Sequence, residues 1–140
     1  MSAKYFLDTN IFVYSFDARQ PGKKERALEL IGAALQSGQG MISTQVIQEF
    51  LNVATRKFDP PIRSEDCKTY LRMVLGPLCE VYPDPALYES SLEIQQETGY
   101  SFYDALILSS ALRGGCEILY SEDLQAGRKL GDLSIVNPFE

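Results

Sequence analysis

Short apolar runs alternate along the chain with longer segments in which apolar residues recur every three or four positions. The short runs are typical of buried strands, and they fall at residues 5–7, 40–43, 78–82, 117–120 and 135–136. The longer segments are typical of amphipathic helices, and they cover residues 27–37, 46–57, 64–75, 85–98 and 102–112. This alternation predicts an α/β fold of three layers, α/β/α, with a central, mostly parallel sheet.

Turn and cap residues mark several of the expected helix ends. Ser64 is expected to cap the third helix, and Gly76 and Pro77 are expected to end it. Asp84 and Pro85 form a cap followed by proline at the first helical position, which favours a helix start. No repeat or low-complexity stretch divides the sequence, so its 140 residues are expected to form one domain.

Composition narrows the possible chemistry. Lys plus Arg number 13 and Asp plus Glu number 19, which gives a net charge of −6. This charge argues against a protein that coats nucleic acid through positive charge alone. The chain has no histidine, which excludes Ser-His-Asp and Cys-His nucleophile systems, histidine-ligated zinc and histidine as a proton carrier. Any enzyme activity must therefore depend on carboxylates.

The cysteines and the first residues bear on location. Cys67, Cys79 and Cys116 are odd in number and widely spaced, so neither a disulfide framework nor a thiolate metal site is expected. The first residues lack the basic start, apolar run and cleavage site of a secretory signal. No stretch reaches the roughly 18 apolar residues of a membrane span. We therefore expect a protein of the reducing cytoplasm that does not enter a membrane.

Four acidic residues fall where the expected fold can bring them together. Asp8 and Asp123 follow expected strands, at the edge of the sheet where ligands of open parallel sheets bind. Glu49 lies at the border of the apolar face of a helix, and Asp104 lies in the first turn of the most apolar helix. Gathered carboxylates repel one another unless cations lie between them. Oxygen-rich acidic clusters select Mg²⁺ or Mn²⁺, and such metals can ionise water near neutral pH without a histidine base.

Each acidic residue also has a purely local interpretation. Asp8 could cap the turn after its strand, and Glu49 could be a solvated position on a helix edge. The serine and aspartate of residues 101–104 have the spacing of a capping box, a local stabiliser worth about 1 kcal/mol. Asp123 could be another cap, in which case Glu122 is the carboxylate that takes part in a site.

Four motifs, taken in order, resemble the PIN-domain family over nearly the whole chain. They are FLDTN at residues 6–10, STQVIQEFLNV at 43–53, SFYDALILSSAL at 101–112 and ILYSEDLQAG at 118–127. The resemblance implies a single PIN-like nuclease domain over residues 1–140 that holds one or two divalent metals, Mg²⁺ or Mn²⁺. It assigns the metals to an acidic quartet with two supporting polar groups. These are Asp8, Glu49, Asp104 and Asp123, with Thr9 and Asn10 in support.

The resemblance also implies an activity and partners. PIN-domain proteins cleave phosphodiester bonds, mostly in single-stranded RNA. Small bacterial members resemble VapC-type toxins, which are ribonucleases held inactive by a cognate antitoxin, and family members commonly form homodimers. Arg56, Lys57 and Arg63 surround an expected proline break and are the candidates for RNA contact.

Two other functions stay open from the sequence. A phosphatase of the haloacid-dehalogenase kind also places an aspartate after its first strand, but it uses a second acid two positions later, where this chain has Asn10. A PIN-like module without catalysis could instead bind RNA or a protein partner. The intact acidic quartet argues against this second alternative.

Overall fold

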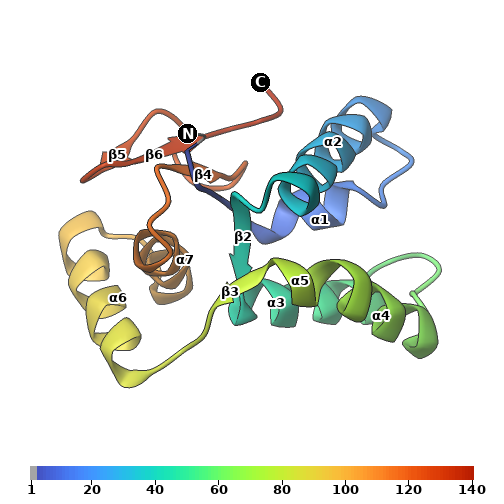
Figure 1. The fold of residues 1–140 in the computed structure, drawn as a ribbon, viewed down its shortest axis with the longest axis horizontal. Coiled ribbons are helices and arrows are strands. Elements are labelled where there is room, and N and C mark those ends of the chain that lie inside the picture. The colour runs from blue at the N-terminus through green and yellow to red at the C-terminus, as the bar shows by residue number, and fades with distance from the viewer. Residues whose placement is uncertain (1–2) are drawn as a thin grey trace.

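The computed structural model describes residues 3–140 and contains a central six-stranded sheet (Figure 1). The strands are β1 (Tyr5–Leu7), β2 (Gly40–Ser43), β3 (Cys79–Val81), β4 (Ile118–Tyr120), β5 (Lys129–Leu130) and β6 (Leu133–Val136). They lie in the order β3-β2-β1-β4-β6-β5. Every neighbouring pair is parallel except β5 and β6, so the prediction of a mostly parallel sheet is confirmed.

The helices follow the expected alternation with the strands. They are α1 (Thr9–Tyr14), α2 (Pro21–Ser37), α3 (Thr44–Arg56), α4 (Ser64–Tyr70), α5 (Gly76–Leu78), α6 (Pro85–Thr98) and α7 (Phe102–Arg113). α2 ends where Gly38 adopts a φ of 72°, a conformation that costs glycine little. α1 was not among the expected helices, because six residues are too few to show a helical period. Within residues 3–140, no helix is long and apolar enough to cross a membrane.

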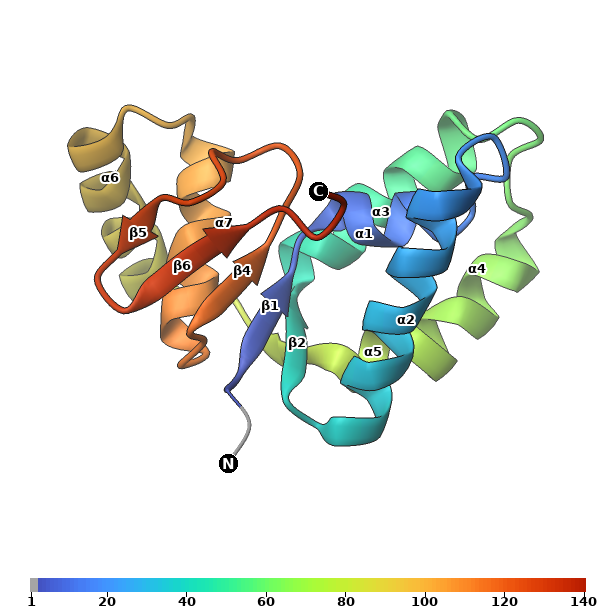
Figure 2. The same ribbon diagram turned by 90° about the horizontal axis from the view of Figure 1, so that it is seen from above.

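Helices cover both faces of the sheet. Figure 1 shows α6 and α7 on one side and α1, α2 and α3 on the other, and Figure 2 shows the strands side by side from β5 to β2. α7 packs against β2 and β4, whereas α2 packs against β2 from the opposite side. Phe6 and Leu7 are neighbours in β1 and so point to opposite faces, yet both are fully buried. The predicted three-layer α/β/α architecture is confirmed.

The third expected helix differs from its prediction at both ends. Ser64 does not cap it; Arg63 holds the extended cap conformation, and Ser64 is already the first helical residue of α4. Gly76 and Pro77 do not end it either, since a π-helical turn, η1 (Leu71–Leu75), continues α4 into α5. This wider turn leaves Pro77 at the start of α5, where a residue needs no N–H donor.

The last strand belongs to a hairpin that the sequence pattern missed. β5 has two residues and pairs antiparallel with β6, with Leu130 opposite Leu133. The loop of Gly131 and Asp132 joins the two strands, and Gly131 has the positive φ, 60°, that tight hairpin loops require. A two-residue strand shows no alternation, so it gives no signal in the sequence.

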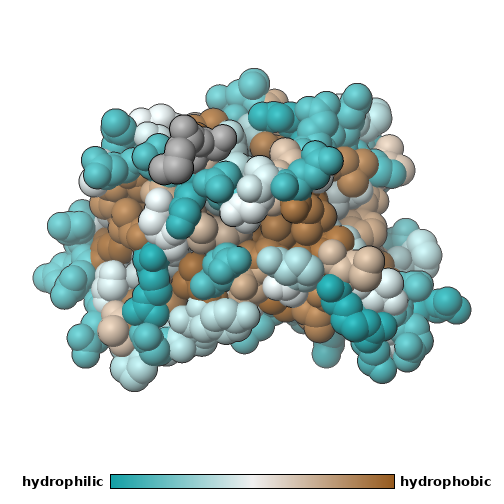
Figure 3. Space-filling model, viewed as in Figure 1, coloured by the Kyte–Doolittle hydropathy of each residue, from teal (hydrophilic) through white to brown (hydrophobic). Residues whose placement is uncertain are grey.

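Large apolar side chains interrupt the charged surface. Figure 3 shows apolar patches between hydrophilic residues on the face seen in Figure 1. On α2, Leu28 is 51% exposed and Leu35 is 40% exposed. They are seven positions apart, about two helical turns, so they lie on the same side of the helix. This part of α2 therefore offers an apolar surface to solvent.

Candidate acidic active site

The centre of the candidate site lies where β1 and β4 end side by side. β1 has β2 on one side and β4 on the other, so the chain order reverses between β1 and β4, and ligands of open α/β sheets bind at such a point. Asp8 follows β1 and caps α1, as its local interpretation predicted. Asp8 Oδ1 accepts a hydrogen bond from Thr9 N, and Asp8 Oδ2 accepts one from Ser121 Oγ, each at 2.7 Å. Two donors thus fix the carboxylate of Asp8.

Asp8 is a buried acid among other acids. Its residue is 8% exposed. Burial raises the pKa of Asp8 from 3.8 to about 6, against the opposing effect of the hydrogen bonds from Ser121 and Thr9. The charges of Glu49 and Asp123 raise the pKa further, so both carboxylates lie close enough to act on Asp8. The structure therefore brings three of the four predicted acids into electrostatic contact.

Glu49 is held from two sides. It lies in α3, and its Oε1 accepts a hydrogen bond of 2.6 Å from Thr9 Oγ1. Its Oε2 accepts one of 3.3 Å from Gln45 Nε2, one turn earlier in the same helix. Thr9 therefore binds Asp8 through its backbone and Glu49 through its hydroxyl. Thr9 thus contacts both acids, and its supporting role at a metal site stays a prediction.

Asp104 lies in the first turn of α7. Gln45 Nε2 also donates to the carbonyl oxygen of Tyr103 at 3.1 Å, which joins α3 to the start of α7. Ser101 Oγ accepts a hydrogen bond from Asp104 N at 3.2 Å, so the predicted helix cap is present. That cap uses the backbone of Asp104. The side chain of Asp104, a partly exposed residue, therefore takes no part in this bond.

The two acids that follow β4 have different surroundings. Glu122 accepts hydrogen bonds from Tyr14 Oη and Lys23 Nζ, both at 2.5 Å. Partial burial raises the pKa of Glu122, but these two hydrogen bonds outweigh it and leave the pKa below its usual value. Asp123 is exposed and acts electrostatically on Asp8. Glu122 is thus bound to Lys23, whereas Asp123 is the acid of this pair that acts on Asp8.

The donor set suits a hard divalent cation in its chemistry. Carboxylate oxygens are the ligands that Mg²⁺ and Mn²⁺ prefer. Burial is the main cause of the raised pKa of Asp8, and the charges of Glu49 and Asp123 add a repulsion that a cation would relieve. Within residues 3–140, however, no three acidic or cysteine side chains are arranged so that they could hold a metal ion. Asp123 is the exposed member of the four acids, so its side chain is free to adjust.

Other polar groups at the site were predicted only in part. Asn10 was expected to support the acids, and both polar atoms of its side chain are buried without a hydrogen-bond partner in the described structure. Ser121 and Gln45 were missed. Ser121 is the first residue after β4, so the strand-end rule that selected Asp8 would have found it. Gln45 stands four residues before Glu49, a spacing that places both on one helix face.

The basic candidates lie at the C-terminal end of α3 and just before α4. Arg56 ends α3 seven residues after Glu49, about two turns and 10 Å along the axis. Lys57 caps that helix, and Arg63 precedes α4 and lies 3.6 Å from Asp66. All three basic residues are exposed. In the described structure, none of the three donates a hydrogen bond to Asp8 or Glu49.

Comparison with known proteins identifies the family. Residues 5–129 match the PIN domain family. The chain therefore belongs to the PIN domain family, as the four motifs suggested. No curated protein sequence matches the chain.

Solved structures share the fold. A toxin-antitoxin complex from Klebsiella pneumoniae aligns with a TM-score of 0.71 at 23% identity, over 99% of each chain. VapC20 of Mycobacterium tuberculosis, a toxin that cleaves the sarcin-ricin loop, aligns with a TM-score of 0.58 at 22% identity, over 86% of this chain and 90% of that one. DNA-bound VapBC from Salmonella typhimurium aligns with a TM-score of 0.65 at 18% identity, over 96% and 97%.

Proposed function

We propose that this chain is a divalent-metal-dependent ribonuclease that hydrolyses phosphodiester bonds of single-stranded RNA, with one nuclease domain over residues 1–140. The observation that carries the proposal is the buried Asp8, which lies where the strand order reverses between β1 and β4. Its pKa is raised to about 6, and the charges of Glu49 and Asp123 act on it. A carboxylate in such a place costs stability. Perturbed acids of this kind are found mostly at functional sites.

Asp8, Glu49, Asp104 and Asp123 would hold Mg²⁺ or Mn²⁺. When bound, the metal supplies Lewis-acid activation of water and of the phosphodiester group. The chain's own task is to orient the ligands. Thr9 and Ser121 hold Asp8, and Thr9 also holds Glu49. Asn10, with its unpartnered amide, is a further polar group that a bound ligand could reach.

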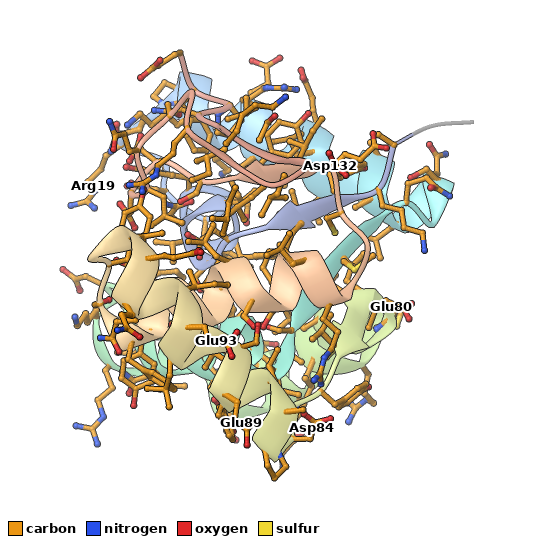
Figure 4. The ribbon with its side chains drawn as sticks, turned by 90° about the vertical axis from the view of Figure 1, so that its left-hand side faces the viewer. Arg19, Glu80, Asp84, Glu89, Glu93 and Asp132 are labelled. Atoms are coloured by element: carbon orange, nitrogen blue, oxygen red, sulfur yellow. The ribbon has the colours of Figure 1, made fainter. Side chains whose placement is uncertain are left out.

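Charge indicates the side from which RNA reaches the site. Figure 4 shows Glu89 and Glu93 on α6, four residues apart and both exposed, so this helix presents a negative surface. RNA phosphates would avoid it. Arg56, Lys57 and Arg63 lie instead at the end of α3 and the start of α4. We therefore assign the RNA path to the α3 side of the acids.

The direct test measures cleavage of a fluorescent single-stranded RNA with Mn²⁺, with Mg²⁺ and with a chelator. Asp8→Asn should lower kcat by at least about a hundredfold, which is about 2.7 kcal/mol of transition-state stabilisation. Asparagine is as good an N-cap as aspartate, so α1 should still form. Asp132→Asn, at the exposed β5–β6 loop, is the matched control and should keep full activity.

The same test separates the alternatives. Activity that survives both the chelator and Asp8→Asn would contradict the metal mechanism. A folded wild-type chain with no activity under any of these conditions would support the non-catalytic PIN-like module instead. Membership of the PIN family already sets aside the haloacid-dehalogenase phosphatase.

We further propose that the chain is the toxin of a VapBC-type pair, acts in the cytoplasm and forms a homodimer. Two structures with the same fold are toxin-antitoxin assemblies. The exposed Leu28 and Leu35 on α2 offer apolar surface for a protein partner. Expression of the chain should arrest growth, and co-expression of a small neighbouring gene should restore it. Normal growth with active enzyme and no such gene would contradict the toxin role.

A further inference from the structure

Gln45 occupies an unusual position for an amide side chain. It lies in the first turn of α3 and is only 6% exposed. Its Nε2 group has two hydrogens, and the structure shows two acceptors for them, Glu49 Oε2 at 3.3 Å and the Tyr103 carbonyl at 3.1 Å. One buried amide thus joins the side chain of Glu49 to the backbone of the turn that carries Asp104.

The chemistry of the neighbours fixes which way this amide faces. If its oxygen and nitrogen were exchanged, an oxygen would face the carboxylate of Glu49 and the carbonyl of Tyr103, so three acceptors would meet without a hydrogen. The amide of Gln45 must therefore keep its NH₂ group toward these two residues. Its carbonyl oxygen, Oε1, then points the other way and has no hydrogen-bond partner in the described structure.

Gln45 also lines a small cavity that contains polar side chains. It has a volume of about 50 Å³, and its lining includes Ser43, Gln45 and Ser110. The hydroxyls of both serines are buried without partners, as is Gln45 Oε1. A polar cavity of this size has room for at least one water molecule, which could donate to Oε1. Such a water would satisfy Oε1 without competing for the Nε2 hydrogens that bind Glu49 and the Tyr103 carbonyl.

We propose that Gln45 is a positioning residue, whose amide holds the Glu49 carboxylate and the first turn of α7, with Asp104, in one fixed relation. The inference rests on the proposed metal-dependent function, because its consequence is a pair of acids set for a shared cation. Thr9 fixes one oxygen of Glu49, and Gln45 fixes the other. Partners of this kind, one contact behind the ligands, commonly change metal affinity tenfold to a hundredfold when removed.

The test measures Mn²⁺ binding by calorimetry without RNA, and RNA cleavage separately. Gln45→Met keeps the length of the side chain and suits a helix, but it cannot donate. We expect it to weaken Mn²⁺ binding at least about tenfold. Gln48→Met makes the same chemical change at an exposed position of α3 and should bind Mn²⁺ like the wild type. Should Gln45→Met fail to fold, Gln45→Asn keeps the amide but falls one methylene short of Glu49, and it should show the same loss.

A double mutant shows whether Gln45 acts through Glu49. In a Glu49→Gln background, Gln45→Met should cause much less further loss of Mn²⁺ affinity than it does alone. Equal affinities of Gln45→Met and Gln48→Met would overturn the proposal, and so would a full tenfold loss in the Glu49→Gln background, or a wild-type chain that binds no Mn²⁺. A wild-type chain that binds Mn²⁺ but cleaves no RNA would contradict the proposed activity alone, because the calorimetry would still decide the role of Gln45.

Discussion

The inner and outer parts of the acidic site are built differently. In the inner part, Asp8 and Glu49 each have both carboxylate oxygens bonded to donors on neighbouring segments. In the outer part, Asp104 is partly exposed and Asp123 is exposed. The inner acids thus keep their positions by hydrogen bonds within the protein, whereas the outer acids are limited mainly by their backbone.

This difference suggests a division of work. Burial of the Asp8 carboxylate carries a desolvation penalty even when no ligand is bound. The hydrogen bonds from its two donors offset part of that penalty. An exposed acid such as Asp123 pays little and can turn toward a cation when one binds. We infer that the inner part sets where a cation binds, and that the outer part completes its coordination.

The largest expected effect tests the burial of Asp8 through pH. Its folded pKa, about 6, lies above the ordinary 3.8, so the protonated form stabilises the fold below about pH 4 and that stability is lost as pH rises through 6. Asp8→Asn removes this dependence. The gain in unfolding free energy from the mutation should therefore be greater at pH 7.5 than at pH 4, by on the order of 3 kcal/mol, in metal-free denaturant titrations.

The control for this measurement is Asp132→Asn, which is exposed and should change stability equally at both pH values. If Asp8→Asn changed the unfolding free energy equally at pH 4 and pH 7.5, burial would not raise the pKa of Asp8. The contrast between the inner and outer parts would then disappear.

The sequence predicted the position of Asp8 better than the side-chain hydrogen bonds around the acids. Asp8 could be placed because a strand end in a parallel sheet is also a ligand edge. The sequence could not show that Glu49 is bonded by Gln45, nor that Glu122 turns away to Lys23, because both contacts depend on how helices pack around the sheet. Side-chain direction at a loop, as for Glu122 and its neighbour Asp123, has no period that a sequence pattern could reveal.

Most of the fold followed from apolar periodicity, and the exceptions have local causes. The long helices and buried strands carry enough residues to show a period of 3.6 or 2. α1 and β5 are too short to do so. The π-helical turn η1 arises where Pro77 would otherwise break the helix, and the sequence alone shows only the proline.

The next effect tests the outer part through metal linkage. At about 100 times its Kd, Mn²⁺ should raise the unfolding free energy by about 2.7 kcal/mol and Tm by several degrees. Asp104→Asn should remove more than half of this rise. The cap of α7 should survive, because Ser101 accepts from the backbone of residue 104. Equal shifts in the wild type and the mutant, measured by thermal melts, would leave Asp104 with a local role only.

A smaller effect should separate the two neighbouring acids of the outer part. Glu122→Gln loses the charge that Lys23 binds, at a contact whose side chains are 32% and 23% exposed. It should lower the unfolding free energy by about 1 kcal/mol and change Mn²⁺ affinity less than about twofold. Glu117→Gln, exposed before β4, is the control and should do neither. A tenfold loss of Mn²⁺ affinity in Glu122→Gln would show that Glu122 is a ligand after all.

The smallest effect concerns the basic end of α3, outside both parts of the acidic site. Arg56→Gln removes the phosphate contact proposed for this residue, about two turns from Glu49, and should raise KM for RNA about twofold to fivefold, with kcat unchanged. The slope of log affinity against log salt should fall by about 0.7, the value for one contact to a single strand. Lys129→Gln, on β5 at the far edge of the sheet, should change neither quantity. Equal changes from both variants would show that RNA responds to net charge, and that the end of α3 has no special part in binding it.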